Sequence, residues 1–168
     1  GPACSSAAPA ASLGRNLRSA RVTTLSLAPI SPGDFAQWAP LWRAYLAFYE
    51  TELDENIYQT TFARLIAADH PDQCGVLAWQ GARAVGLVHY IYHAHNWRAE
   101  RVCYLQDLYA TPDTRGTGVG RALIERVYAQ ADADGCPSVY WMTQEFNTQA
   151  RKLYDRIGHL TPFIKYQR

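Results

Sequence analysis

Residues 102–133 constrain the fold more than any other part of the sequence. An apolar run typical of a β-strand, residues 102–109, leads into a turn with glycines at positions 116, 118 and 120. Directly after the turn, residues 121–133 carry apolar side chains at helical spacing. Such a turn aims several backbone N–H groups at one point, and the dipole of the following helix adds positive potential there. The stretch therefore predicts a binding site for an anion such as a phosphate group.

The residue types of this turn fit a phosphate site. Glycine has no side chain to bar the approach of a phosphate, and it accepts a positive φ. Arg115 adds a positive charge beside the glycines. The spacing is GxGxG rather than the GxGxxG of dinucleotide-binding folds, and Arg121-Ala122 stands where a P-loop has Lys followed by Ser or Thr. Glycine spacing alone is also consistent with a turn that only ends a strand and binds no anion.

Apolar periodicity along the chain predicts one domain around this stretch. We expect strands at residues 22–27, 74–79, 84–92, 102–109, 138–142 and 163–166, and helices at 35–49, 57–68, 121–133 and 147–157. The order is β-α-α-β-β-β-α-β-α-β, a mixed α/β (α+β) fold whose central sheet is mixed, mostly antiparallel and flanked by helices. Residues 22–168 form this domain, and residues 1–21 are expected to be a flexible tail or the remnant of a cleaved tag.

Composition limits the partners and the compartment. The 168 residues carry 16 Lys and Arg against 15 Asp and Glu, and this net charge of +1 favours neither nucleic acid nor membrane as a partner. No apolar stretch approaches the roughly 18 residues that cross a bilayer. The four cysteines form no CxxC pair, which favours free thiols in the reducing cytoplasm over a disulfide framework.

Several motifs resemble one family of enzymes. The sequence Arg115-x-x-Gly118-x-Gly120 between a strand and a helix resembles the acetyl-CoA motif of the GNAT superfamily. Four further motifs resemble the branch with polyamine, thialysine and histone/D-amino-acid acetyltransferases: Trp42-x-x-Tyr45-x-x-Phe48-Tyr49, Tyr104-Leu105-x-Asp107-Leu108-Tyr109, Glu145-x-Asn147 and Ala150-x-x-Leu153-Tyr154. They follow one another in the family's order, so the resemblance implies a GNAT-like domain that uses acetyl-CoA and no metal.

The resemblance also implies a set of cofactor contacts. The pantetheine arm would pair with the backbone of the strand before the turn, at Leu108 and Ala110. The pyrophosphate would contact the turn and the start of the helix, at Arg115, Gly116, Thr117, Gly118, Gly120 and Arg121. Asn147 stands where the family commonly places a cofactor contact, but asparagine is also a good N-cap for the helix that it opens, and both roles are open.

Tyr154 is the residue that the resemblance marks as the catalytic acid, beside the cofactor. In the family, a tyrosine at this helix position protonates the departing CoA thiolate, and a phenol with a pKa of about 10 is a suitable donor. Ala150, Leu153, Tyr154 and Ile157 also have the spacing of a buried helix face. A purely structural role for Tyr154 is therefore the alternative.

An amine acceptor beside Gln106 and Asp107 is a further implication of the resemblance. The polyamine branch carries two acids there, whereas Gln106 cannot act as a base. The general base is then Asp107, Glu145, Glu100 or a water relay. One carboxylate fewer also argues against a strongly polycationic substrate such as spermine.

Aromatic residues of the first predicted helix are candidates for acceptor contacts. Trp42, Tyr45 and Tyr49 belong to the core by default, yet the first helices of this fold often wall the acceptor cleft. His89, His93 and His95 are spaced like ligands on one strand face. Because the predicted strand ends near residue 92, we expect exposed histidines without a metal, although His93 could border the amine site.

The resemblance predicts direct acetyl transfer to a primary amine of a small molecule or amino acid. A protein lysine is a further acceptor that the same chemistry would serve. The alternative from another class is a non-catalytic acyl-CoA-binding or regulatory module, and the presence of Tyr154 beside the turn favours the enzyme. A homodimer is expected from the branch, whose members often exchange or pair their C-terminal strands.

Overall fold

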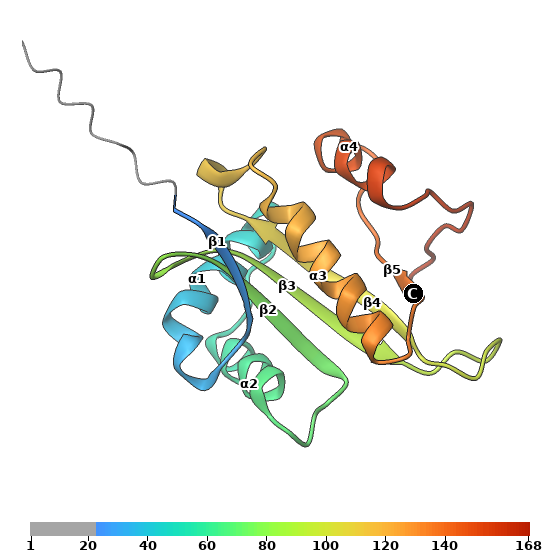
Figure 1. Cartoon of the computed structure of the whole chain (residues 1–168), viewed down its shortest axis with the longest axis horizontal. Helices are drawn as coiled ribbons and strands as arrows, with labels where there is room; N and C mark the ends of the chain where they lie inside the picture. Colours follow the sequence, from blue (N-terminus) through green and yellow to red (C-terminus); the bar gives the residue numbers. More distant parts are fainter. Residues whose placement is uncertain (1–22) are drawn as a thin grey trace, which may run out of the picture.

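The computed structural model describes residues 23–168 and contains one five-stranded sheet with the strand order β1-β2-β3-β4-β5 (Figure 1). The predicted tail at residues 1–21 lies outside the described residues. Neighbouring strands are antiparallel, except that β5 runs parallel to β4. The strands are β1 Leu25–Pro29, β2 Gln73–Gln80, β3 Arg83–His93, β4 Val102–Ala110 and β5 Val139–Tyr140. The predicted mixed, mostly antiparallel sheet is thus confirmed.

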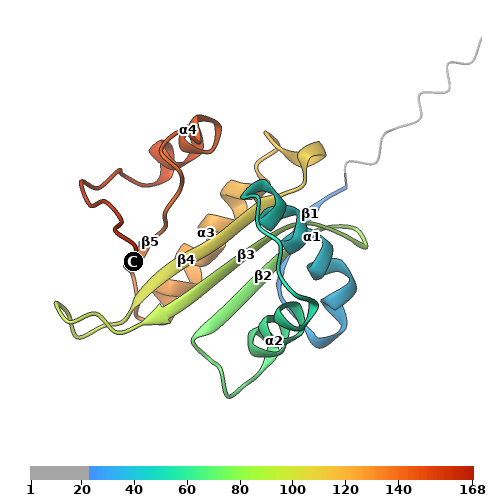
Figure 2. The ribbon, with the colours of Figure 1, turned by 180° about the vertical axis from the view of Figure 1, so that it is seen from behind.

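Helices cover both faces of this sheet (Figures 1 and 2). Helices α1 (Phe35–Phe48) and α2 (Glu55–Ile66) lie on one face, and α3 (Val119–Ala133) lies on the other. Each face of the sheet has its own hydrophobic core, and successive side chains of β2 point into one or the other. Val76 packs with the α3 residues, whereas Leu77 packs with the α1 residues. The last helix, α4 (Thr148–Ile157), packs its apolar side chains against the core on the α3 side.

The strand predicted at residues 163–166 is wrong. The observed order is β-α-α-β-β-β-α-β-α, with short 3₁₀ helices at Pro32–Asp34 (η1) and Pro112–Thr114 (η2). A strand needs a hydrogen-bonding partner, and β5 offers only two residues. Phe163, Ile164 and Tyr166 keep 76–87% of their surface exposed, so the segment does not join the sheet of its own chain.

Most boundaries differ from the predicted ones by one to three residues, among them those of β1, α2 and α3. Strand β1 extends through Pro29, because a proline is tolerated on an edge strand. Helix α2 begins at Glu55 instead of residue 57, directly after the extended residue Asp54. Helix α3 begins at Val119, so the last glycine of the turn belongs to its first turn. Within residues 23–168, no helix has the length and apolar character of a membrane span.

Candidate active site

The glycine turn lies directly before α3, where the sequence predicts an anion site. Gly116 and Gly118 have φ values of 79° and 94°, a backbone conformation that favours glycine. A Cβ atom at either position would meet nothing within 4 Å, so both face open space. The first N–H that bonds back along the helix is that of Ala122, to the Gly118 carbonyl at 2.9 Å. The N–H groups of the first helical turn therefore remain for an anion.

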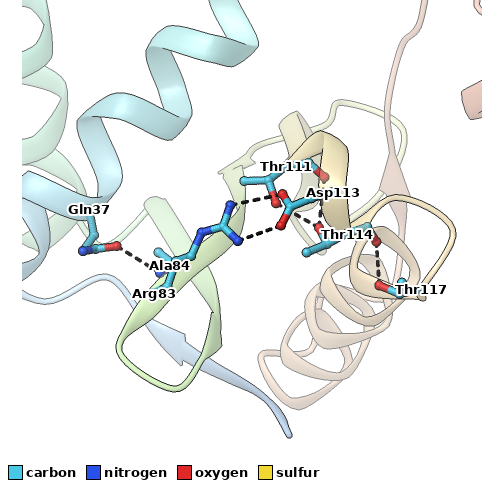
Figure 3. A network of polar contacts seen from close by, with 7 residues as sticks. All are labelled: Gln37, Arg83, Ala84, Thr111, Asp113, Thr114 and Thr117. Atoms are coloured by element: carbon cyan, nitrogen blue, oxygen red, sulfur yellow. Dashed lines mark hydrogen bonds and ion pairs between the residues drawn. The ribbon is translucent and has the colours of Figure 1, made fainter. Parts of the chain in front are cut away.

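A hydrogen-bond network holds the beginning of this turn against β3 (Figure 3). Arg83 binds Asp113 with two nitrogens at 2.7 and 3.1 Å. This guanidinium holds the pKa of the Asp113 carboxyl well below its usual range. The Thr111 N–H donates to the Val85 carbonyl at 2.8 Å, and the Thr111 and Thr114 hydroxyls lie 3.0 Å apart. The turn thus has a defined shape before any ligand binds.

Three side chains of the predicted cofactor set have partners within the protein. The Arg115 Nε donates to the Ala110 carbonyl at 3.3 Å, so Arg115 turns back to the end of β4. The Thr117 hydroxyl and N–H both donate to the Thr114 carbonyl, at 2.5 and 3.2 Å. Arg121 pairs with Glu125 at 2.8 Å. Each arginine uses the Nε of its guanidinium in these contacts, so its other N–H groups remain as donors beside the backbone N–H groups of the turn.

The second half of β4 has an open edge. Strand β5 pairs with β4 only at Cys103 and Tyr104, and the chain then diverges from β4 toward α4 (Figure 2). Leu108 and Ala110, the predicted partners of the pantetheine arm, lie beyond that pairing. An unpaired strand edge offers backbone donors and acceptors to an extended ligand.

A β-bulge at Gln106 decides which way Asp107 points. The register between β3 and β4 pairs Tyr90 with Leu105 and His89 with Asp107, so Gln106 is the extra residue. Leu105 and Leu108 therefore both pack on the α3 side. Asp107 turns to the α1 side, where its Oδ2 accepts a hydrogen bond from Trp42 Nε1 at 3.2 Å. The side chain of Gln106 is exposed.

His89 is a residue of this site that the sequence interpretation missed. It was expected to be exposed, but only 5% of its surface is exposed, and its Nδ1 lies 2.8 Å from Asp107 Oδ2. Helices cover β3 on both faces, so even its polar side chain is buried. The apolar residues on either side of His89 in β3 were the available signal. His93 lies 2.8 Å from the Tyr140 hydroxyl instead.

Two tyrosines at the end of α1, Tyr45 and its C-cap Tyr49, lie near the Asp107 carboxylate. Burial and then the charge of Asp107 raise the pKa of both Tyr45 and Tyr49 above the ordinary value. Tyr49 also hydrogen-bonds with Tyr45 and with Thr143, which sequence reasoning missed for lack of any motif. Burial and then Tyr49 raise the pKa of Tyr154 to about 12. Tyr45 and Tyr49 thus lie next to Asp107, and Tyr49 connects this group to Tyr154.

The remaining predicted residues lie around this cluster or outside it. Asn147 caps α4, since its side chain accepts from the Ala150 N–H at 3.5 Å and donates to Thr143 at 3.1 Å. Glu145 is exposed on the same loop. Glu100 precedes β4 by two residues, and the strand carries Asp107 roughly 20 Å further along, so Glu100 does not join the site. Across residues 23–168, no three His, Cys, Asp or Glu side chains are placed to hold a metal ion.

Comparisons with known proteins agree with this geometry. Residues 38–159 match the model of the acetyltransferase (GNAT) family. The D-amino-acid N-acetyltransferase HPA3 of Saccharomyces cerevisiae is 40% identical over 141 residues, which cover 83% of this chain and 87% of the relative. The thialysine N-epsilon-acetyltransferase of Bos taurus is 32% identical over 79 residues, 47% of this chain and 46% of the relative.

A solved structure shows the same fold. The aminoglycoside N-acetyltransferase AAC(6′)-Iy, in complex with a CoA-containing bisubstrate analogue, superposes with a TM-score of 0.76 at 16% identity. The superposition covers 86% of this chain and 97% of that protein. The predicted fold class is confirmed by this likeness.

Proposed function

Since this chain belongs to the acetyltransferase (GNAT) family and is an acetyl-CoA-dependent N-acetyltransferase, we propose that its acceptor is the primary amine of a small molecule, with free amino acids as the first candidates. The observation that carries the proposal is the buried Asp107 carboxylate. It lies near Tyr45 and Tyr49, the second of which also interacts with Tyr154, on the strand whose open edge leads to the glycine turn.

The residues present fit the cosubstrate. The open space at Gly116 and Gly118 and the free N–H groups at the start of α3 suit its pyrophosphate. The unpaired edge at Leu108 and Ala110 suits the amide groups of its pantetheine arm. When bound, acetyl-CoA supplies the acetyl group as a thioester.

Asp107 and Tyr154 would move the protons of the transfer. An ammonium group cannot attack a carbonyl, so Asp107 accepts a proton from the acceptor and leaves a neutral amine. The transfer forms the bond from nitrogen to the acetyl carbon and breaks the bond from that carbon to sulfur. Tyr154 donates a proton to the sulfur and regains one from solvent, and the second nitrogen proton and the proton on Asp107 leave to solvent. The products are an amide and a free thiol.

Charge in the site supports a small acceptor with one or two amines. Gln106 is neutral, so Asp107 is the single carboxylate at this point of β4. Glu50 and Glu52 line a hollow at the end of α1, directly after Tyr49, where they would attract a cationic acceptor. The relatives are named for D-amino acids and thialysine, which are small amines of this kind.

The exposed C-terminal segment supports a homodimer. Leu160, Phe163, Ile164 and Tyr166 are apolar or aromatic and 76–87% exposed. Such a segment is typical of an interface rather than of free surface. A second copy of the chain would cover it by pairing with the equivalent segment.

A panel of amines tests the proposed function. Thiol release from acetyl-CoA is measured with D- and L-amino acids, spermine and a histone-tail peptide. We expect an amino acid to exceed spermine in kcat/KM by tenfold or more, which corresponds to about 1.4 kcal/mol. Spermine as the best acceptor would contradict the inference from Gln106, and the peptide as the best acceptor would favour a protein lysine. No turnover with any amine, despite acetyl-CoA binding, would favour the non-catalytic module.

A further inference from the structure

A chain of three buried side chains crosses the sheet beneath the proposed acceptor site. Trp38 Nε1 on α1 lies 2.8 Å from His89 Nε2 on β3, and His89 Nδ1 lies 2.8 Å from Asp107 Oδ2 on β4. Their exposed fractions are 0%, 5% and 6%. The two hydrogen-bonded pairs are 51 and 18 positions apart in sequence, so only the tertiary fold joins them.

The hydrogen bond from Trp38 sets the protonation state of His89. An indole N–H can only donate, so His89 Nε2 must accept with its lone pair. The single ring proton is then on Nδ1, which donates it to Asp107. A doubly protonated ring would place two N–H groups against each other at 2.8 Å. The contact between His89 and Asp107 is therefore a hydrogen bond from a neutral ring, not an ion pair.

Within residues 23–168, Asp107 is consequently a buried carboxylate without a cationic partner. Its donors Trp42 and His89 are neutral and both bind Oδ2, and the Tyr45 hydroxyl is a further neutral hydrogen-bond partner. The groups that face it from α1 and from its own strand are phenols, those of Tyr45, Tyr49 and Tyr104. In the part of the chain that the structure describes, the ion pairs of Arg side chains involve other carboxylates: Glu55, Asp72, Asp113 and Glu125.

A buried negative charge that is hydrogen-bonded but not neutralised costs folding stability. Such arrangements are concentrated at functional sites, where a ligand supplies the missing charge. The ammonium group of an amine acceptor is a ligand of that kind. Trp38 and Trp42 lie one helical turn apart and stack with ring centres 5.2 Å apart, so a single face of α1 provides both indole donors of the cluster.

We propose that His89 is a positioning residue for acetyl transfer: Trp38 fixes it as a neutral hydrogen-bond donor, and it keeps Asp107 ionised and oriented toward the acceptor ammonium. The inference rests on the proposed function. His89 contacts neither the acceptor nor the cosubstrate and acts only through Asp107. It also explains why a histidine is buried in β3 between two apolar layers.

The activity test compares two substitutions of His89. His89→Phe keeps a planar ring and removes the donor, and His89→Asn keeps an N–H close to the position of Nδ1. Loss of a hydrogen-bond donor favours the protonated form of a carboxylate. We therefore expect His89→Phe to lower kcat/KM by about 10- to 100-fold at neutral pH, within the range of acid–base contributions. The acidic limb of its pH–rate profile should move to higher pH, while acetyl-CoA affinity stays unchanged.

His89→Asn should recover most of the activity and keep the acidic limb of the unsubstituted protein. A uniform loss at every pH, or an Asn variant no better than the Phe variant, would overturn the proposal in favour of a purely structural role. The Asn variant also decides the matter if His89→Phe does not fold, since a shifted acidic limb in the Asn variant would contradict the proposed donor.

A spectroscopic measurement decides the proposal without turnover. In the unsubstituted protein labelled with ¹⁵N-histidine, NMR at neutral pH should show the His89 ring as the Nδ1–H tautomer with a lone pair on Nε2. Trp38→Phe removes the indole donor, so a proton on Nε2 should become detectable in that variant. A proton on Nε2 of His89 in the unsubstituted protein would overturn the inference, even if acetyl transfer itself is confirmed. An Nδ1–H tautomer in a protein that acetylates no amine would instead refute the proposed function alone.

Discussion

At the scale of single residues, Asp107 and Tyr154 share one cluster but differ in what surrounds them. Asp107 accepts hydrogen bonds from the Trp42 and His89 side chains. Tyr154 is half-buried near Tyr49, and its pKa of about 12 keeps the phenol protonated at neutral pH. A carboxylate that accepts hydrogen bonds and a phenol that keeps its proton suit a base and an acid in the same reaction.

Substitution of Tyr154 by Phe tests the acid directly. The change keeps the ring and its edge contact with Trp141, whose centre is 5.5 Å away, and removes only the hydroxyl. We expect kcat to fall by roughly 10²–10⁴ with little change in acetyl-CoA affinity. Steady-state kinetics with the best amine of the panel measure this effect.

Tyr128→Phe is the matched control for that variant. The Tyr128 hydroxyl donates to the Ile157 carbonyl at 2.8 Å, so this change also removes a hydroxyl beside α4. It should cost about 0.5–1.5 kcal/mol of unfolding free energy and leave kcat unchanged. Equal turnover of the Tyr154→Phe variant and the control would assign Tyr154 to the core and proton delivery to water.

At the scale of elements, β4, the glycine turn and α3 form one unit whose two parts have different surroundings. The turn faces open space at Gly116 and Gly118, whereas α3 packs closely on β3 beneath it. At Gly86 of β3, a Cβ would approach Val119 Cγ1 to 2.9 Å. One end of the unit is therefore shaped for a ligand, and the remainder for the core.

The variant Gly118→Ala tests the turn as the pyrophosphate site. Its φ of 94° makes any side chain strained, at a cost of about 1–2 kcal/mol. Gly135, at the other end of α3, has a φ of 67° and similarly open space, so Gly135→Ala is a control for the strain alone. Differential scanning fluorimetry with and without acetyl-CoA compares the two.

Both variants should lower Tm by similar amounts in the absence of ligand. Only Gly118→Ala should also reduce the increase in Tm that acetyl-CoA produces, since that increase depends on affinity for the folded state. An unchanged ligand-induced shift in Gly118→Ala would remove this turn from the binding site.

At the scale of the whole molecule, the site exists only where three layers meet. Tyr45 comes from α1 and Tyr49 is the C-cap of that helix, Asp107 comes from the sheet and Tyr154 from α4. The same assembly partly buries several phenols. Burial is the main reason why the pKa values of Tyr45, Tyr90, Tyr92 and Tyr154 are raised. Folding thus favours the protonated form of these side chains.

Alkaline pH should therefore unfold the protein cooperatively. A folded-state pKa above the ordinary value of 10.0 stabilises the fold fully below pH 10, and this stability is lost as pH rises through the folded-state values. Urea midpoints at pH 8, 10 and 11.5, followed by phenolate absorbance, check the prediction. Midpoints that stay constant while the phenols ionise would contradict the burial of these hydroxyls.

The proposed dimer makes a second prediction at this scale. The double variant Phe163→Ser with Ile164→Ser removes exposed apolar surface outside the helices and the sheet. We expect it to remain folded and to shift the mass in solution from dimer to monomer, as measured by light scattering. A monomeric unsubstituted protein, or a dimer that the variant leaves intact, would contradict the role of this segment.

Features that depend on consecutive residues were readable from the sequence. The alternation in β2 and β3, the glycines of the turn and the helical spacing around Tyr154 each reflect local backbone geometry, and the structure has them in the predicted order. For Asn147 the sequence left both an N-cap role and a cofactor contact open, and the N-cap that the structure has is equally local. The sequence by itself therefore determined the order of these elements along the chain, the glycine turn between β4 and α3, and the helix that carries Tyr154.

Only the tertiary structure decided what is buried and what is paired. His89 is buried because helices from distant parts of the chain cover both faces of β3, and Asp107 faces α1 because the register with β3 places a bulge at Gln106. The segment at residues 163–166 has strand-forming residues but no partner strand in its own chain. Burial and strand pairing are properties of segments far apart in sequence, so no local pattern specifies them.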